Sequence, residues 1–505
     1  MTQNSRLTEK NKKREVMFMK RMVSFSLALL MFLFVFAGCQ SGKKPGPTPV
    51  DPQSETDSVL PEKTWEGREL KAIEKDTSVV ESAIDADDVS TKISSEVYAR
   101  NAAIEAKYNF TITTNRYSAE RSPSESIVWN EAAAGESTYD IVVDASSYMK
   151  GCLSDFVFAD LRALPYIKWT APGWDQSSND NLTVCGYQFV CTGDLNLREK
   201  AGASVIFCNR TMLEQYTTED LRQTVLDHEW TMEKMKELSA LVATKDSGTG
   251  EVTRYGLVNS SNNVFLNFMK STYGMDICTK DENDVPSFTF DNSAYYEKTI
   301  GWIDDLLLLY SNPDYTYTQR YSGTKPNAME DLFKNGKALF YGGELGDVLD
   351  FQENCSFTYT TFPYPIYNAE TQHEYHAAYN YSTSTLIAIP TLAKDTAFAA
   401  FALQAMNERS SKLVQYFVEE KCKIRGSVDQ TDYDLMTLAV SNGAYDLGTI
   451  INWGAVKTWI FMDRYADASG IQSIAVSGQN TFASLWAADK ELAHEELNEY
   501  LKVFE

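Results

Sequence analysis

Apolar positions in the first part of the chain follow two different spacings. Residues 68–73, 110–113 and 139–143 carry apolar alternations or runs that predict strands, whereas residues 93–108 and 126–134 place apolar side chains on one helical face. Helices that join strands in this way predict an α/β fold, in which a mostly parallel sheet is covered by helices on both faces.

The same pattern continues along the rest of the chain, without an internal repeat of fixed period. Further predicted strands are 204–208, 334–341 (a turn leading into a strand) and 386–389, and further predicted helices are 211–216, 231–243, 303–310 and 395–407. In open sheets of this type, ligands bind beyond the carboxyl ends of the strands. Polar residues that follow a predicted strand are therefore the first candidates for a site.

The N-terminal segment has the pattern of an export signal. An uncharged, mostly apolar stretch from Met22 to Ala37 directly follows Lys20 and Arg21, and it is short for a membrane span. It ends in Phe36-Ala37-Gly38-Cys39, which resembles the lipobox of bacterial lipoproteins. The resemblance implies that residues 1–38 are a signal peptide and that Cys39 receives a lipid and becomes the mature N-terminus. The alternative is an uncleaved anchor with an incidental cysteine.

Residues 39–62 are rich in Pro, Gly, Ser and charged side chains and show no apolar period. This composition predicts a flexible tether, which would hold a globular body near a membrane without restricting its orientation. No later segment is long and apolar enough to cross a bilayer.

Charge narrows the classes of partner. The chain has 505 residues and a formal net charge of −24, with 43% hydrophobic and 23% charged residues, as in a globular protein. Because phosphate binding depends on clustered Lys and Arg, we expect no nucleic-acid partner. An anionic lipid surface would also repel the body unless a tether holds it there.

Signatures of metal sites and of enzymes are weak. Seven cysteines remain besides Cys39, an odd number without a C-x-x-C pair, so buried free thiols are expected. His373 and His376 stand three apart in a polar loop and do not form the H-E-x-x-H helix of a metalloprotease. There is no G-x-S-x-G and no P-loop, and 281–284 lacks the calcium-loop pattern. We therefore predict neither cofactor nor metal, and no enzymatic activity.

An ordered set of short segments carries a resemblance to a known family. The set includes Arg100-Asn101-x-x-Ile104-Glu105-x-Lys107-Tyr108-Asn109, Tyr139-Asp140-Ile141, Asp160-Leu161-x-x-Leu164-Pro165-Tyr166-Ile167, Pro172-Gly173-Trp174-Asp175, Gly193-Asp194, Phe207-x-Asn209-Arg210, Glu229-Trp230-Thr231, Arg254-Tyr255-Gly256, Phe333-x-x-Gly336-Lys337-Ala338-Leu339-Phe340, Pro363-Tyr364-Pro365, Ile389-Pro390 and Tyr445-Asp446-Leu447-Gly448-x-x-x-Asn452-Trp453-Gly454. In this order, over about residues 64–505, they resemble family 1 extracellular solute-binding proteins, the lipoproteins of ABC sugar importers. One departure is Gly173, where relatives often carry a second aromatic residue.

The resemblance implies a two-lobed, periplasmic-binding-protein-like fold of type II, with discontinuous α/β lobes joined by crossing strands around a cleft. Residues 63–200 and 386–445 would form lobe one, and residues 201–385 and 446–505 would form lobe two. Closure of the lobes around a solute would be a hinge motion, and the cleft would hold the ligand.

A sugar offers hydroxyl groups and apolar C–H faces, so its site needs paired donors and acceptors and flat aromatic platforms. Polar candidates at strand ends or next to the expected crossing, together with aromatic candidates, are Ser146, Tyr148, Asp194, Asn196 and Glu344, and Trp174, Tyr381 and Trp453. Glu344 follows Gly342 and Gly343, where backbone can approach closely. The alternative for each polar residue is an ordinary loop hydrogen bond, and for each aromatic residue core packing.

These features predict a monomeric, lipid-anchored protein on the outer face of the cell membrane. It would capture a sugar or oligosaccharide and deliver it to the permease subunits of an ABC importer. The alternatives from other classes are a lipid-anchored surface glycan hydrolase and a surface sensor or adhesin. Turnover of a glycan panel would favour the hydrolase, and the absence of neighbouring permease genes would favour the sensor or adhesin.

Overall fold

The computed structural model describes residues 58–75, 82–86, 88–117, 122–259, 264–317, 328–370, 372–381, 383–421, 429–443, 445–461 and 473–505. Within the chain, residues 55–505 form one compact unit, and the following description concerns this unit alone. The predicted signal peptide, Cys39 and most of the tether lie outside the described residues. Among the described residues, no helix has both the length and the apolar character that a membrane crossing needs.

The first sheet has the strand order β12-β3-β1-β2. Its strands are β1 (Arg68–Lys75), β2 (Phe110–Tyr117), β3 (Ile141–Ala145) and β12 (Thr385–Ala388). β1 pairs in parallel with both β2 and β3, and β12 adds to β3 in antiparallel register, with Thr385 opposite Ala145. The three strands that come first in the chain thus form the parallel core that the sequence predicts.

The second sheet is mixed. It has the order β11-β4-β10-β6-β5, with β9 also paired to β6, and it consists of β4 (Ser204–Asn209), β5 (Thr244–Lys245), β6 (Val252–Asn259), β9 (Thr316–Tyr317), β10 (Ala338–Glu344) and β11 (Tyr359–Phe362). β10 runs parallel to β6 but antiparallel to β4. A separate hairpin joins β7 (Cys278–Lys280) and β8 (Pro286–Phe288). The prediction of a mostly parallel sheet therefore fits the first sheet better than the second.

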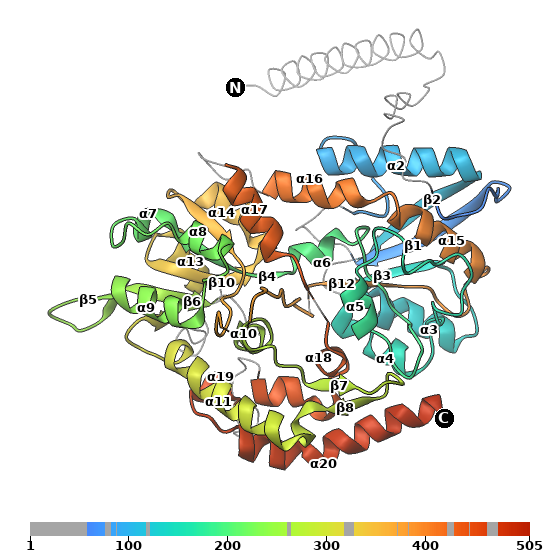
Figure 1. The fold of residues 1–505 in the computed structure, drawn as a ribbon. Coiled ribbons are helices and arrows are strands. Elements are labelled where there is room, and N and C mark those ends of the chain that lie inside the picture. The colour runs from blue at the N-terminus through green and yellow to red at the C-terminus, as the bar shows by residue number, and fades with distance from the viewer. Residues whose placement is uncertain are drawn as a thin grey trace, which may run out of the picture. The chain divides into compact units, whose positions relative to one another are not determined.

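Helices flank both sheets (Figure 1). The α-helices are α2 (Lys92–Tyr108), α3 (Trp129–Ala133), α4 (Lys150–Ser154), α5 (Gln176–Asn181), α6 (Leu197–Ala201), α7 (Arg210–Leu213), α8 (Leu221–Leu226), α9 (Met232–Val242), α10 (Val264–Tyr273), α11 (Ser293–Tyr310), α13 (Ala328–Lys334), α14 (Val348–Asn354), α15 (Thr396–Asn407), α16 (Ser411–Lys421), α17 (Gln430–Ala439), α18 (Leu447–Ile451), α19 (Ile474–Ser477) and α20 (Phe482–Leu501). Shorter helical turns are η2 (Ser124–Val128), η3 (Ser146–Tyr148), η4 (Thr289–Asp291), η5 (Leu345–Asp347), η6 (Trp453–Ala455), η7 (Lys457–Phe461) and η8 (Lys502–Phe504).

Helix α2 shows how the local sequence sets these elements. The side chain of Thr91 accepts a hydrogen bond from the backbone N–H of Ser94, whose side chain in turn accepts one from Thr91, so the first turn is capped. Every apolar position that predicted the inner face, including Val97 and Ile104, is fully buried. The helix ends at Asn109, which adopts the left-handed conformation that commonly closes a helix.

Each sheet has an aromatic core of its own. Beside the first sheet, the ring of Phe401 on α15 lies 4.8 Å from Tyr108 and 5.3 Å from Trp65. Beside the second, the ring of Phe351 on α14 lies 4.9 Å from Phe207 and 5.1 Å from Phe333. Burial of such side chains contributes roughly 1.5–3 kcal/mol each to folding.

The chain builds the first sheet from two distant stretches, because β12 returns to it after the whole of the second sheet. The predicted lobe boundaries themselves stay a prediction. One helix inside the predicted lobe one, α17, packs against β11 of the second sheet, and its Asp432 accepts a hydrogen bond from Thr360. The stretch 386–445 therefore contacts both sheets.

The described cysteines are free thiols, as predicted, and five of the six are buried. Burial raises the pKa of the Cys152 thiol to about 12, so it stays protonated and behaves as a small apolar side chain. The loop with His373 and His376 contains neither helix nor strand, and the described residues hold no cluster of His, Cys, Asp and Glu suited to a metal ion.

Candidate functional site

The carboxyl end of β3 meets residues 379–381 and 383–385, the described residues of the segment that leads into β12 (the segment 379–385). Ser146 directly follows β3 and is fully buried, and its hydroxyl donates a 3.0 Å hydrogen bond to the carbonyl of Tyr381. Its backbone N–H donates to the carbonyl of Ser384 at 3.1 Å. Two of the predicted site residues, Ser146 and Tyr381, are thus brought together.

Lys75 is the last residue of β1, and its ammonium lies 4.7 Å from the ring centroid of Tyr148. This is a cation–π distance. Burial lowers the pKa of Lys75, and the nearby carboxylate of Asp144 opposes that shift. Tyr148, a predicted site residue, therefore lies beside a buried cation that the sequence did not single out.

The second sheet reaches the same segment through Glu344, the last residue of β10. Its carboxylate accepts a 2.8 Å hydrogen bond from the hydroxyl of Thr383 and another hydrogen bond from the amide of Asn380. Burial raises the pKa of Glu344, and these two hydrogen bonds oppose the shift. The segment 379–385 therefore contacts strand ends of both sheets, at Ser146 and at Glu344.

Tyr381 is 9% exposed, and one face of its ring is occupied. The ammonium of Lys457 lies 3.3 Å from the ring centroid and donates a 2.6 Å hydrogen bond to the carbonyl of Thr449. A sugar ring could stack only on the other face. The ammonium makes that face less electron-rich, so apolar contact would dominate such stacking.

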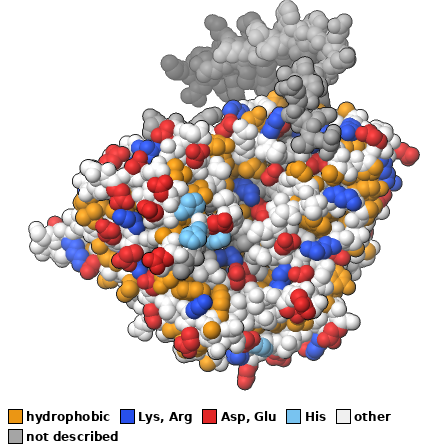
Figure 2. Space-filling view, viewed as in Figure 1, with side chains coloured by type: hydrophobic (Ala, Val, Ile, Leu, Met, Phe, Trp, Pro, Cys, Tyr) orange, Lys and Arg blue, Asp and Glu red, His pale blue; other side chains and the backbone are white. Residues whose placement is uncertain are grey.

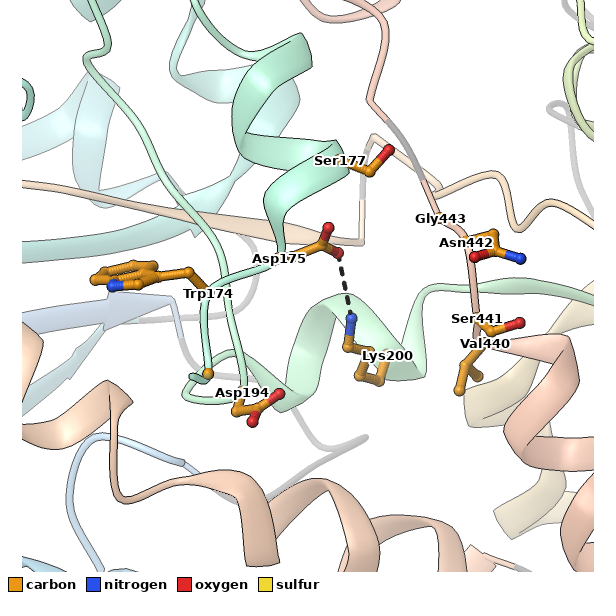
Figure 3. Close-up of a pocket in the computed structure, with 10 residues that line it drawn as sticks. Trp174, Asp175, Ser177, Asp194, Lys200, Val440, Ser441, Asn442 and Gly443 are labelled. Atoms are coloured by element: carbon orange, nitrogen blue, oxygen red, sulfur yellow. Dashed lines mark ion pairs between the residues drawn. The ribbon is translucent and has the colours of Figure 1, made fainter. Parts of the chain in front are cut away.

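Trp174 and Asp194 line a cavity of about 300 Å³ between the start of α5, helix α6 and the segment 440–443. Figure 3 shows Asp175 and Lys200 pointing toward each other across this cavity. The ammonium of Lys200 lies 3.7 Å from the Asp175 carboxylate. Burial raises the pKa of Asp194, and the charge of Lys200 opposes the shift. The walls offer carboxylates, hydroxyls and an ammonium, a polar lining suited to a small hydrogen-bonding solute.

A buried ion pair lies behind that cavity. Glu199 is fully buried, and its carboxylate lies 2.9 Å from the ammonium of Lys200, which also donates a 3.4 Å hydrogen bond to the hydroxyl of Tyr379. Burial raises the pKa of Glu199 to about 7, although Lys200 opposes this. Burial also acts against the charge of Lys200, but Glu199, Tyr379 and Asp175 together raise its pKa well above the ordinary value. Lys200 therefore stays charged throughout the physiological range.

No protein-family model matches the sequence, and no curated protein matches it either. Many solved structures share its architecture. The fold is two-lobed and periplasmic-binding-protein-like.

Three of the structures illustrate the match. UspC of M. tuberculosis has a TM-score of 0.54 and 12% identity over 84% of this chain and 99% of its own. A cyclo/maltodextrin-binding protein complexed with maltotetraose has a TM-score of 0.53 and 12% identity over 87% and 97%. An extracellular solute-binding protein from Staphylococcus aureus in complex with maltose has a TM-score of 0.51 and 12% identity over 87% and 100%. At this identity the likeness concerns the fold.

Asn196 lies in a segment that connects the two sheets, and its side chain is fully used in hydrogen bonds within the protein. The Asn196 amide caps α6, accepts a 2.7 Å hydrogen bond from the hydroxyl of Thr385 and donates a 2.6 Å hydrogen bond to the carbonyl of the same residue. The predicted residue Asn196 thus joins two connecting segments with all of its polar atoms. We leave it out of the proposed ligand site.

Trp453 lies in the core. It is 2% exposed, and its ring lies 5.5 Å from Tyr500 on α20 and 6.2 Å from Phe288. Trp174 is also largely buried, with its indole N–H donating to Gln404 at 3.1 Å, but it contributes to the cavity wall. We therefore keep Trp174 among the candidates and leave out Trp453.

Gly173 is explained by its surroundings. Its backbone has a φ of +92°, and a Cβ there would lie 2.7 Å from the carbonyl oxygen of Asn407. Both the left-handed conformation and the close backbone require glycine, so an aromatic side chain would not fit at this position.

Sequence reasoning missed the cations of the site, Lys75, Lys200 and Lys457. The residues next to each lysine show no continuous apolar run, and a lysine in such a sequence is normally exposed to solvent. Only the tertiary contacts with Tyr148, Glu199 and Tyr381 show that they are buried.

Proposed function

We propose that this chain is a non-enzymatic, extracellular solute-binding protein that captures a sugar or oligosaccharide and delivers it to an ABC importer. The observation that supports this proposal most strongly is the meeting of strand ends from two sheets on one segment, 379–385, in a two-lobed fold. Two of the solved structures with this fold hold maltose and maltotetraose.

The chemistry of the site suits a saccharide. Hydroxyl, amide and carboxylate groups can pair with sugar hydroxyls, and the ring of Tyr381 can cover a C–H face of the sugar on the side away from Lys457. We place the ligand against Tyr148, Tyr381 and Glu344, with the cavity at Trp174 and Asp194 as an adjoining part of the site.

Closure would take place at the segments that connect the two sheets. We propose that the lobes follow the sheets, with residues 63–200 and the return strand β12 in lobe one and the stretch from β4 to β11 in lobe two. A few residues in such connections can absorb the change of backbone angles in a hinge motion.

The anchor is part of the same proposal. Lipidation of Cys39 would hold the acidic body at the outer face of the cell membrane, within reach of the permease subunits. On the face drawn in Figure 2, acidic and basic side chains are interspersed, with no broad basic surface among the described residues that could bind anionic lipid. We expect Cys39→Ser to release the chain from the membrane fraction and to abolish its lipid mass. Retention of both in the variant would contradict the anchor.

Ligand-induced stabilisation tests the binding function. The full chain in mild detergent is heated with each member of a panel of neutral saccharides that includes maltose, maltotetraose, cellobiose and mannobiose. A saccharide at 100 times its Kd should add about 2.7 kcal/mol to the free energy of unfolding. Binding without product would support the proposal. Release of shorter saccharides would contradict it and indicate a hydrolase, and the absence of any stabilisation would contradict saccharide capture.

A further inference from the structure

The cavity beside α5 and α6 contains a carboxylate without a partner. Asp194 lies on its wall, and the backbone N–H of this residue donates a 2.7 Å hydrogen bond to the carbonyl of Gly173, which holds it in place. The carboxylate of Asp194 is partly buried, yet it makes neither a hydrogen bond nor an ion pair with any residue that the structure describes. Removing a charge from water without a partner costs free energy. A ligand that brings the missing partner would recover that cost.

The ammonium of Lys200 does not balance the charge of the cavity. It lies 2.9 Å from the carboxylate of Glu199 and 3.7 Å from that of Asp175, so two carboxylates already share it. Asp194 adds a third carboxylate to this group. Even when Glu199 takes up a proton, two carboxylates remain against one ammonium, and the cavity keeps an excess of negative charge.

The two carboxylates on the cavity wall also act on each other. Burial raises the pKa of Asp194, the charge of Lys200 opposes this, and the charge of Asp175 raises the pKa further. Asp175 is held in place, because its carboxylate accepts a 3.0 Å hydrogen bond from the backbone N–H of Ser178 at the start of α5. A cation bound at Asp194 would relieve this repulsion, whereas a neutral hydroxyl group would leave it in place.

The cavity has room for an amino group and for part of the sugar ring that carries it. Its volume of about 300 Å³ is roughly that of ten waters in the liquid. The hydroxyls of Ser177 and Ser441 and the amide of Asn442 complete the polar lining, and they can pair with ring hydroxyls. Figure 3 shows Ser441 and Asn442 across the cavity from Asp175 and Asp194.

We infer that this cavity is a subsite for a protonated amine, and that the chain prefers saccharides with a free amino group to neutral ones. The inference rests on the proposed function and deepens it, because it names the class of saccharide. The ammonium would donate hydrogen bonds to the carboxylate of Asp194, and such charge-assisted hydrogen bonds are stronger than those of a neutral hydroxyl. An acetylated amine carries no charge and would lose this advantage.

Three β-1,4-linked disaccharides test the preference, because they differ only in the substituent at the second carbon of each ring. The disaccharide of glucosamine carries an amine, N,N′-diacetylchitobiose an acetamide, and cellobiose a hydroxyl. Their Kd values for the full chain in mild detergent are measured by titration calorimetry at pH 6, where the amine is protonated. The amino disaccharide should bind at least about tenfold more tightly than either neutral one. Added salt should reduce the difference, since it screens the charges.

The substitution Asp194→Asn keeps the shape of the side chain and removes its charge. The ratio of the affinities for the amino disaccharide and for cellobiose should therefore fall about tenfold. Asp180→Asn is the matched control, because Asp180 lies on α5 with a side chain that is 75% exposed and is not among the residues lining the cavity. It removes the same charge and should leave the ratio unchanged.

The outcomes separate the two proposals. If a neutral disaccharide binds the unchanged chain as tightly as the amino disaccharide or more tightly, the inference is wrong while the proposed function stands. An undiminished preference in the Asp194→Asn variant would also overturn it. If neither the amino disaccharide nor any saccharide of the panel binds the unchanged chain, the proposed function itself fails.

Discussion

At the residue scale, helix α6 carries a buried pair of opposite charges. Glu199 and Lys200 are neighbours in the short helix α6, and both are buried beside Tyr379 from a distant part of the chain. A buried pair of this kind need not add net stability, but either charge becomes costly when its partner is removed. The pair can therefore be examined by removing one member at a time.

We expect Lys200→Met to lower the free energy of unfolding by roughly 3–5 kcal/mol at pH 8, because it leaves the Glu199 carboxylate buried and unpaired. Urea titrations at pH 8 and pH 5 measure this. The loss should be smaller at pH 5, where the carboxyl takes up a proton. Lys71→Met is the matched control, since Lys71 and Glu69 form an exposed pair at 3.4 Å, and we expect a change within about 0.5 kcal/mol. Equal effects of the two substitutions would contradict the role of burial.

At the scale of elements, the connecting segments are held by close backbone packing. A Cβ at Gly443 would lie 2.1 Å from the hydroxyl of Tyr379, and the carbonyl of Gly443 accepts a 3.2 Å hydrogen bond from Ser178 on α5. The ring of Tyr379 lies 5.0 Å from that of Tyr445. Gly443 and Tyr445 thus pack against α5 and Tyr379.

The substitution Gly443→Ala should destabilise the protein by about 1–3 kcal/mol through overpacking. Thermal unfolding measures the change. Gly301→Ala serves as the opposite case, because Gly301 lies inside α11 with no atom within 4 Å of the added methyl. This substitution should raise stability by up to about 1 kcal/mol, since alanine favours the helix. A stable Gly443→Ala variant would show that Tyr379 can move away at little cost.

At the scale of the whole molecule, buried carboxyl groups set the response to pH. Burial and the charge of Glu344 raise the pKa of Asp347 to about 8, and burial raises that of Glu199 to about 7. In the unfolded chain both groups titrate near pH 4. Between these values the folded protein binds more protons than the unfolded chain, so stability falls as the pH rises.

We therefore expect the free energy of unfolding to be higher at pH 5 than at pH 8, by on the order of 2 kcal/mol or more. Urea titrations across this range provide the measurement. Glu199→Gln should make the dependence shallower, because the amide does not titrate. A stability that rises steadily from pH 5 to pH 8 would contradict the raised pKa values.

Much of the element pattern could be read from the sequence, because it depends on local spacing. The inner face of α2 and the strand at 68–73 follow directly from apolar periodicity, although β1 continues to Lys75. Helix α15 is capped by Asp395, where the predicted helix begins. The helix predicted at 211–216 is shorter, because α7 ends at Leu213. Ser146 and Glu344 were predicted to follow strands, and the structure has Ser146 directly after β3 and Glu344 as the last residue of β10; their role in ligand binding stays a prediction.

The sequence by itself determined strands such as β1 to β4 and helices such as α2, α9 and α15, since apolar period and capping act over a few residues. Only the tertiary structure decided that β4 runs antiparallel to β10, that Trp453 is buried, that Asn196 is bonded to Thr385, and that Lys200 is buried. These outcomes depend on contacts between stretches far apart in the chain, such as Lys200 with Tyr379. Such contacts leave no periodic trace in the sequence, because they are set by the packing of complete elements against one another.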